Sequence, residues 1–327
     1  MFSHQLFELQ SLMGKTLKIG TRGSKLALWQ ANWVKSALTD RHPSLSVQLV
    51  IIKTKGDKIL DVPLAKVGGK GLFVKEIEEA LLDGRIDLAV HSMKDMPSEI
   101  PNGLCIGAIP ERENPQDVLI SKKGQPLSQL EPGARIGTSS LRRAAQLLHA
   151  RPDLRVFPLR GNLDTRLKKL ETENMDAIVL AAAGVKRLGL ENKITEFLDE
   201  NIMLPAVGQG ALCIEVREND PEVAPIVAEL EHRQTRTIVM GERAFLNRLE
   251  GGCQVPIAAH GTIDNARFTL CGLVATVDGK TLIKETLSGP EGSAETLGIE
   301  LADHMVSLGA KTIMENLKSD LDLNHER

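Results

Sequence analysis

The residues of this sequence that are best suited to chemistry stand where predicted strands end. Residues 86–93, IDLAVHSM, form a predicted apolar strand, and Lys94 and Asp95 follow it directly. In α/β proteins, ligand sites lie outside the carboxyl ends of the sheet strands. Taken alone, the pair favours a surface ion pair, because perturbed catalytic carboxylates are the minority case. His91 and Ser92 add polar groups at the end of the strand and favour a functional site.

Arginines are also placed at the carboxyl ends of predicted strands, and in larger number. Six of them fall at or just beyond the C-terminal ends of predicted strands: Arg22, Arg142, Arg143, Arg160, Arg166 and Arg187. The helices that begin nearby start with hydroxyl residues, which favour anions: Thr21, Ser24, Thr138, Ser139 and Ser140. Guanidinium groups suit carboxylates or phosphates, at about 1.5–3 kcal/mol per charged hydrogen bond before desolvation. The placement predicts a cleft for a substrate with several negative charges, rather than basic residues that merely cover helix surfaces.

Cys253 lies in the segment RLEGGCQVPIAAH, directly after a predicted helix and two glycines. A lone cysteine is most often a small buried hydrophobe. A thiolate nucleophile is disfavoured, because the dipole at a helix C-terminus opposes ionisation and no histidine lies within six residues. A thiol that is alkylated once and then kept as an inert thioether suits this position better. We therefore interpret Cys253 as an attachment point.

The composition argues against several other classes of protein. Aromatic residues make up 3% with no tyrosine, and the net charge is −3, so nucleic acid is not an expected partner. The cysteines form no CxxC pair and no HxxxH motif is present, so no metal site is predicted. The N-terminal segment is a poor signal peptide, and no apolar run reaches the roughly 18 residues of a membrane span. We therefore expect a soluble, cytoplasmic protein.

Alternating strands and helices must position the candidate residues. The expected strands of a first lobe are 16–21, 46–54 and 86–93, with helices at 24–41 and 71–84. A second lobe repeats the plan with strands near 134–140, 154–161 and 175–184 and helices at 141–149 and 162–173. Both KIGTRGSKLALWQA and RIGTSSLRRAAQLL place IGT and a serine at the step from strand to helix, through internal duplication or coincidence. This rhythm predicts α/β lobes with parallel or mixed sheets.

The remaining segments complete the expected domains. The polar, proline-bearing segment 110–126 is predicted to be a hinge, residues 211–218 a strand that returns to the first lobe, and residues 221–250 helical. Strands at 255–263, 267–277 and 280–288 and a helix at 293–317 predict a small α+β domain. The expected boundaries are 14–112 plus 209–230 for lobe 1, 116–204 for lobe 2 and 232–320 for the C-terminal domain.

Several of these stretches together resemble the porphobilinogen deaminase (hydroxymethylbilane synthase) family. They are IGTRGSKLALWQA, PLAKVGGKGLFVKE, AVHSMKDMP, GTSSLRRAAQL, LRGNLDTRL, LPAVGQGAL and GERAFLNRLEGGCQVPIA, in family order. The resemblance implies two lobes related to periplasmic binding proteins and a small third domain that carries the cysteine. It also implies a monomeric transferase of tetrapyrrole and haem biosynthesis, which condenses four porphobilinogens with release of ammonia and then frees hydroxymethylbilane by hydrolysis.

The resemblance also implies roles for single residues. A dipyrromethane cofactor would be joined by a thioether to Cys253, and Asp95 would be the catalytic carboxylate. Cofactor carboxylates would bind Lys94, Ser139, Ser140, Arg142, Arg143 and Arg166. Incoming or growing chain units would bind Arg22, Ser24, Arg160 and Arg187.

Two other classes of protein remain open from the residues alone. A non-catalytic two-lobed binding protein would take an anionic ligand and leave Cys253 merely packed. A cysteine-dependent acyl transferase would require a histidine close to Cys253 in space, for which His91 and His260 are the candidates.

Overall fold

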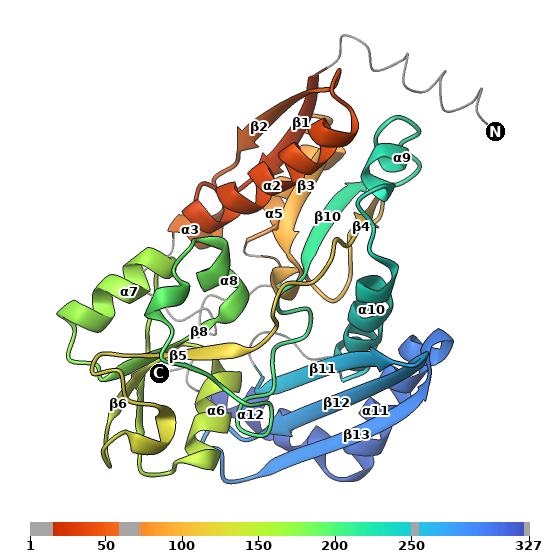
Figure 1. The fold of residues 1–327 in the computed structure, drawn as a ribbon. Helices are drawn as coiled ribbons and strands as arrows, with labels where there is room; N and C mark the ends of the chain where they lie inside the picture. Colours follow the sequence, from red (N-terminus) through yellow and green to blue (C-terminus); the bar gives the residue numbers. More distant parts are fainter. Residues whose placement is uncertain (1–15, 59–70, 72, 250–254, 324–327) are drawn as a thin grey trace. The chain divides into compact units, whose positions relative to one another are not determined.

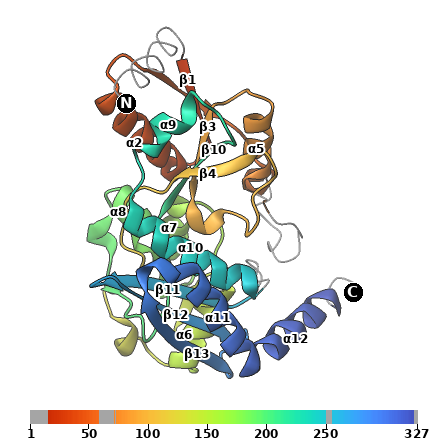
Figure 2. The same ribbon diagram turned by 90° about the vertical axis from the view of Figure 1, so that its right-hand side faces the viewer.

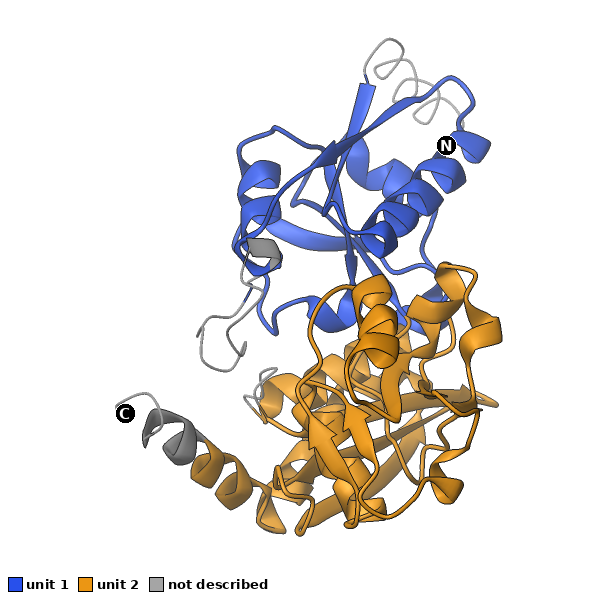
Figure 3. Cartoon of the chain, turned by 90° about the vertical axis from the view of Figure 1, so that its left-hand side faces the viewer, with its two compact units in different colours: residues 1–59, 71–112, 211–236 blue, residues 60–70, 113–210, 237–327 orange. Residues whose placement is uncertain are grey.

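The computed structural model describes residues 16–58, 71, 73–249 and 255–323 (Figure 1). The chain separates into two compact units, which Figure 3 shows in different colours. The first unit comprises residues 1–59, 71–112 and 211–236, and the second comprises residues 60–70, 113–210 and 237–327. Among the helices of the described ranges, none combines the length and the hydrophobicity needed to cross a lipid bilayer.

The first unit is built on a five-stranded mixed sheet with the strand order β2-β1-β3-β10-β4. Strands β1, β2 and β3 are parallel, whereas β10 is antiparallel to both β3 and β4. The predicted return of residues 211–218 to the first lobe is confirmed, because β10 lies between β3 and β4. The strands are β1 (Thr16–Thr21), β2 (Ser46–Ile51), β3 (Leu88–Ser92), β4 (Leu104–Ala108) and β10 (Leu212–Arg217).

Helices α2 and α5 cover opposite faces of this sheet. Apolar residues of α2 pack in one core cluster with Leu88 and Val90 of β3, whereas α5 packs in another with Ala89. Successive side chains of a strand point to opposite faces, so His91 lies on the face that α5 covers. The helices of this unit are α2 (Lys25–Arg41), α3 (Lys55–Lys58), α5 (Lys75–Leu82) and α9 (Val223–Ala228).

The second unit contains another five-stranded mixed sheet, with the strand order β7-β6-β8-β5-β9. Strand β6 is parallel to β7 and β8, and β5 is antiparallel to β8 and β9. Its strands are β5 (Asp117–Ser121), β6 (Arg135–Gly137), β7 (Arg155–Phe157), β8 (Ala177–Ala181) and β9 (Glu196–Phe197). Its helices are α6 (Leu141–Ala150), α7 (Leu163–Thr172) and α8 (Ala182–Arg187).

One expectation about this unit is wrong. The polar, proline-bearing segment 110–126 is expected to be a hinge, but it contains β5, whose five residues are all buried. The strand is short and is flanked by proline and charged residues. Its apolar run is therefore too brief to be recognised in the sequence pattern. Paired with β8 on one side and β9 on the other, β5 is a structural part of the sheet.

The second unit also contains an antiparallel three-stranded sheet, β11-β12-β13, with α11 packed against it (Figure 2). Phe245, Phe268 and Leu301 are fully buried in its core. The strands are β11 (Ile257–Asp264), β12 (Arg267–Ala275) and β13 (Leu282–Pro290). The neighbouring helices are α10 (Arg233–Arg248), α11 (Ala294–Ser307) and α12 (Ala310–Leu323).

Two long helical segments are each divided. Residues 221–250 form α9 and α10, and the single helix expected at 293–317 is split into α11 and α12 at Gly309, which has a φ of 104°.

The predicted fold class, mixed α/β sheets with a small C-terminal α+β part, is confirmed. The three-part domain boundaries stay a prediction.

Candidate functional site

In the first unit, two neighbouring parallel strands present candidate residues at the same edge of the sheet. Arg22 and Ser24 follow β1, and the short 3-10 helix η1 (Met93–Asp95) follows β3, which pairs with β1 in parallel. Parallel strands place their carboxyl ends at one edge. The loops that follow β1 and β3, both singled out by the sequence pattern, therefore lie together.

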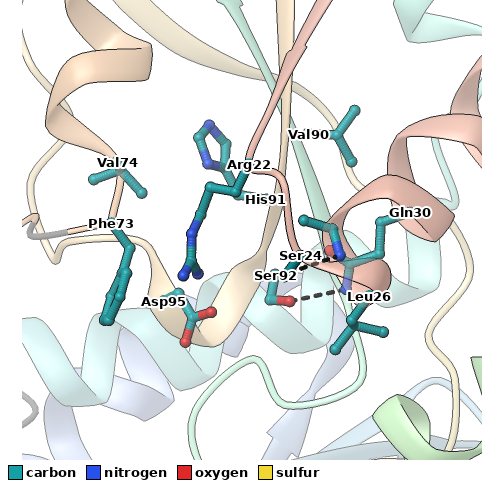
Figure 4. Close-up of a pocket in the computed structure, with 11 residues that line it drawn as sticks. Arg22, Ser24, Leu26, Gln30, Phe73, Val74, Val90, His91, Ser92 and Asp95 are labelled. Atoms are coloured by element: carbon teal, nitrogen blue, oxygen red, sulfur yellow. Dashed lines mark hydrogen bonds between the residues drawn. The ribbon is translucent and has the colours of Figure 1, made fainter. Parts of the chain in front are cut away.

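These loops line a small cavity of about 70 Å³ (Figure 4). The Arg22 side chain extends toward Asp95 and Phe73, and its guanidinium carbon lies 4.3 Å from the centre of the Phe73 ring. Asp95 is exposed, so its carboxylate is accessible to a ligand. The lining residues are Arg22, Ser24, Leu26, Ala27, Gln30, Phe73, Val74, Val90, His91, Ser92 and Asp95.

Hydrogen bonds fix the polar wall of this cavity. Ser24 caps α2, because its hydroxyl accepts a hydrogen bond from the backbone N–H of Ala27 at 3.2 Å. The side-chain amide of Gln30 donates to the hydroxyl of Ser92 at 2.9 Å and so ties α2 to the end of β3. The hydroxyls of Ser24 and Ser92 are thereby held at the cavity by α2.

Lys94 has a different position from its neighbour. It is half-buried and stands beside Asp95 in η1, but it is not among the residues that line the cavity. The cavity thus brings together three of the sequence-predicted residues of this unit, Arg22, Ser24 and Asp95.

In the second unit, the remaining predicted residues follow the parallel strands β6, β7 and β8. The hydroxyl of Ser139 donates to the carbonyl of Leu159 at 3.0 Å, and Ser140 is the N-cap of α6. A capping serine leaves the first backbone N–H groups of the helix directed toward the end of the sheet. The turn between β6 and α6 is thus built as the sequence predicted.

Arg142 and Arg143 are buried, with 6% and 5% of their surface exposed, and both bind Asp117 at the start of β5. Arg142 Nη1 donates to Asp117 Oδ2 at 2.7 Å and to the carbonyl of Leu204 at 2.6 Å. Arg143 donates to Asp117 Oδ1 from Nε at 2.9 Å and from Nη2 at 2.7 Å. Burial lowers the pKa of Arg143, and the Asp117 carboxylate opposes that shift.

The other arginines of this unit are held by backbone carbonyls or by burial. Arg166 Nε donates to the carbonyl of Gly161 at 2.8 Å, and Arg187 Nη2 donates to the carbonyl of Gly210 at 2.7 Å. Burial lowers the pKa of Arg187 to about 10, and the negative charge of Glu113 opposes the shift. Arg160 is half-buried, and burial lowers its pKa.

Cys253 lies outside the described residues, between the end of α10 and the start of β11. The two histidines considered for a cysteine-dependent transferase each contact a glutamate. His91 Nε2 lies 3.1 Å from Glu215 Oε2, and His260 Nδ1 lies 2.8 Å from Glu200 Oε1. Across the described ranges, no group of three His, Cys, Asp or Glu side chains could hold a metal ion.

Sequence reasoning missed Asp117 and Phe73. Asp117 opens an apolar strand, DVLIS, and two consecutive arginines at a helix start require a carboxylate if they are buried. The pair of adjacent arginines is therefore the signal that could have pointed to a buried carboxylate such as Asp117. Phe73 follows a glycine-rich stretch and has no comparable signal, since a single aromatic residue is usually part of a core.

Two family models match most of the chain. The model described as "Porphobilinogen deaminase, dipyromethane cofactor binding domain" matches residues 17–225, and "Porphobilinogen deaminase, C-terminal domain" matches residues 237–307. The chain belongs to the porphobilinogen deaminase family. The predicted family, deaminase function, transferase class and dipyrromethane cofactor are thereby confirmed.

Individual porphobilinogen deaminases are similar to this chain over almost their whole length. The protein from Syntrophotalea carbinolica is 59% identical over 306 residues, which cover 94% of this chain and 97% of the relative. The protein from Pelobacter propionicus is 57% identical over 303 residues, covering 93% and 97%. Among solved structures, the methionine-binding protein MetQ is 15% identical with a TM-score of 0.43, covering 66% of this chain and 89% of its own.

Proposed function

We propose that this chain joins porphobilinogen molecules head to tail at the cavity that holds Asp95. Each condensation breaks the C–N bond of a protonated aminomethyl group, and the electron pair leaves with ammonia. A C–C bond forms from the resulting methylene cation to a pyrrole carbon of the growing chain, and that carbon then loses its proton. After four condensations, water releases the linear tetrapyrrole hydroxymethylbilane. The observation that carries the proposal is the shared cavity of Asp95, Arg22 and Ser24.

Asp95 is the catalytic carboxylate in this proposal. The methylene that loses ammonia becomes cationic, and the pyrrole that attacks it also becomes cationic until its proton leaves. A carboxylate held at that position stabilises both charges and can accept the proton. The guanidinium of Arg22, which extends toward Asp95, offers a partner to a substrate acetate or propionate.

Binding of the substrate carboxylates falls to arginines and a serine. We assign Arg22, Ser24, Arg160 and Arg187 to incoming or growing chain units. Guanidinium forks match carboxylates in geometry, and partial burial strengthens each charged hydrogen bond. Arg160 and Arg187 both show the effect of burial in a lowered pKa.

The residues that would hold the dipyrromethane cofactor fit a polyanionic group. Asp117 supplies one negative charge against the two guanidinium groups of Arg142 and Arg143, so this end of the sheet keeps an excess of positive charge. Dipyrromethane carries acetate and propionate groups, and when bound it supplies the pyrrole carbon at which the chain starts. We assign its carboxylates to Lys94, Ser139, Ser140, Arg142, Arg143 and Arg166, and its thioether to Cys253.

The test of this function is the turnover of porphobilinogen by Asp95→Asn. We expect kcat to fall by about 10²- to 10⁴-fold, the usual worth of a positioned acid–base group, with a much smaller change in KM. Asp83→Asn is the matched control, because Asp83 is an exposed carboxylate paired with Arg85 on the surface of the same unit. Near-normal kcat in Asp95→Asn, with normal folding, would remove Asp95 from the mechanism.

The proposal extends to a monomeric, cytoplasmic enzyme that binds no nucleic acid. The lack of nucleic-acid binding is supported by the net charge of −3, which gives no general attraction for polyanions, and by the absence of tyrosine from the sequence. Light scattering of the purified protein should give a mass near 35.6 kDa.

A further inference from the structure

Behind the Asp95 cavity, the sheet of the first unit holds a buried histidine and a buried glutamate side by side. His91 on β3 is opposite Cys213 on β10, and Glu215 follows two residues later on the same face. His91 Nε2 lies 3.1 Å from Glu215 Oε2, with 5% of His91 and none of Glu215 exposed. His91 also lines the cavity, so this pair connects the cavity wall to the interior.

A second buried carboxyl group faces the same region from α5. Glu78 is 7% exposed, and α5 packs against both β3 and β10. Within the described ranges, Oε1 of Glu78 and Oε1 of Glu215 are buried without a hydrogen-bond partner. A buried, unsatisfied carboxylate oxygen costs several kcal/mol unless the group takes up a proton. The basic residue of α5, Lys75, is exposed.

Two carboxyl groups in one buried region do not both ionise readily. Burial and the negative charge of Glu215 together raise the pKa of Glu78 to about 7, and the charge of His91 opposes the shift. At 3.1 Å, a proton on His91 Nε2 would be donated to Glu215, and Glu78 is the carboxyl group whose pKa is raised.

We propose that His91, Glu215 and Glu78 form a buried triad in which the two carboxyl groups hold one proton between them and fix the His91 ring, so that His91 is a positioning residue for the reaction at Asp95. The triad is separate from the residues assigned to carboxylate binding. The effect of the triad on turnover rests on the proposed function. The hydrogen bond between His91 and Glu215 does not depend on that function.

Other titratable groups approach the triad from each element packed against α5. Glu79 is exposed on α5 itself, and Arg217 of β10 donates to the backbone carbonyls of Leu81 and Ile86 and to Asp220. Burial raises the pKa of Cys105 on β4, as do the charges of Glu218 and Glu215. The titratable groups on these elements are Lys18 on β1, His91 on β3, Cys105 on β4, Cys213, Glu215 and Arg217 on β10, and Lys75, Glu76, Glu78 and Glu79 on α5.

Loss of the shared proton adds one negative charge behind the cavity wall. Because the reaction forms cations beside Asp95, this charge lowers the barrier to their formation in a poorly solvated environment. The rate of condensation should therefore rise as Glu78 ionises, and a side chain that cannot ionise should hold the rate at its low-pH level.

The first experiment is the pH dependence of kcat for Glu78→Gln, with Glu79→Gln as the matched control. In the wild type and in Glu79→Gln, kcat should rise between pH 6 and pH 8. Glu78→Gln should match the wild type within about twofold at pH 6 and fall roughly three- to tenfold below it at pH 8. The same rise in Glu78→Gln as in the wild type would overturn the proposal, as would a wild-type kcat that does not change over this range.

The second experiment reads the triad without turnover, by ¹⁵N NMR of the histidine side chains in the whole protein. The wild type should hold His91 with a proton on Nε2 at pH 6, and Glu215→Gln should change the His91 signals while Glu79→Gln leaves them unchanged. Glu215→Gln should also lower kcat with less than about a twofold change in KM. His91 signals that do not respond to Glu215→Gln would contradict the triad. A wild type that consumes no porphobilinogen would refute the proposed function, and the NMR result would still decide the triad.

Discussion

At the scale of single residues, one carboxylate explains why two adjacent arginines remain buried at the start of α6. Asp117 accepts hydrogen bonds from both Arg142 and Arg143, and the amide of Gln209 donates to it at 3.1 Å. Such a network orients guanidinium groups that would otherwise be flexible. It also makes the arginines dependent on a residue that binds no substrate in our proposal.

Asp117→Asn should therefore destabilise the protein and weaken cofactor retention together. Removing one partner of a buried ion pair leaves uncompensated charge and costs about 3 kcal/mol or more. Denaturant unfolding measures the loss, and intact mass measures the fraction of chains that carry an adduct. Asp303→Asn is the control, because Asp303 pairs with Arg248 on the surface and should cost about 0–1 kcal/mol. Equal stability of the two variants would contradict the structural role of Asp117.

At the scale of elements, the turn before β10 requires glycine for a reason the sequence pattern does not reveal. Gly210 has a φ of +89°, and a Cβ there would lie 2.2 Å from the carbonyl oxygen of Glu113. Its own carbonyl accepts the hydrogen bond from Arg187. Gly210 thus allows a close approach between two backbone segments.

Gly210→Ala should destabilise the protein by about 2–4 kcal/mol, because the clash is with backbone and not with a flexible side chain. Gly84→Ala is the matched comparison. Gly84 also has a positive φ, +68°, but a Cβ there meets nothing within 4 Å, so only about 1 kcal/mol of backbone strain is expected. Denaturant unfolding of both variants measures the difference, and similar losses would show that the approach to Glu113 can relax.

The elements that carry the candidate site were predictable because their signals are local. Strand β1 followed by Ser24, and β6 followed by Ser140, combine an apolar strand with a capping residue. Strand β5 was missed because polar flanks surround five residues, and β9 because two residues, Glu196 and Phe197, give no periodicity at all. Contacts between distant segments, such as Asp117 with Arg143 or His91 with Glu215, depend on strand order, which local patterns do not specify.

At the scale of the whole molecule, one buried carboxyl group of the first unit, Glu78, should affect how stability depends on pH. The pKa of Glu78 is raised from 4.5 to about 7 in the folded protein. A raised carboxyl pKa means that the folded state binds more protons than the unfolded state between these values. Its contribution to stability is therefore fully present below pH 4.5 and is lost as the pH rises through 7.

Glu78→Gln removes that dependence. The free energy of unfolding of the variant minus that of the wild type should rise by about 1–3 kcal/mol from pH 5 to pH 8. The reason is that the neutral amide has no charge to bury. Thermal unfolding at both pH values, with Glu79→Gln alongside, measures the gain. A difference between Glu78→Gln and the wild type that is the same at both pH values would show that Glu78 ionises normally in the folded protein.

The central claim is that this chain primes tetrapyrrole synthesis from a cofactor on Cys253, and the intact mass of the freshly purified, denatured protein tests it most directly. We predict an added mass of two linked pyrrole units, located on the peptide that contains Cys253 and missing from folded Cys253→Ser. A bare chain should acquire the same adduct on incubation with porphobilinogen. A wild-type protein that makes tetrapyrrole while its Cys253 peptide stays unmodified would contradict the claim.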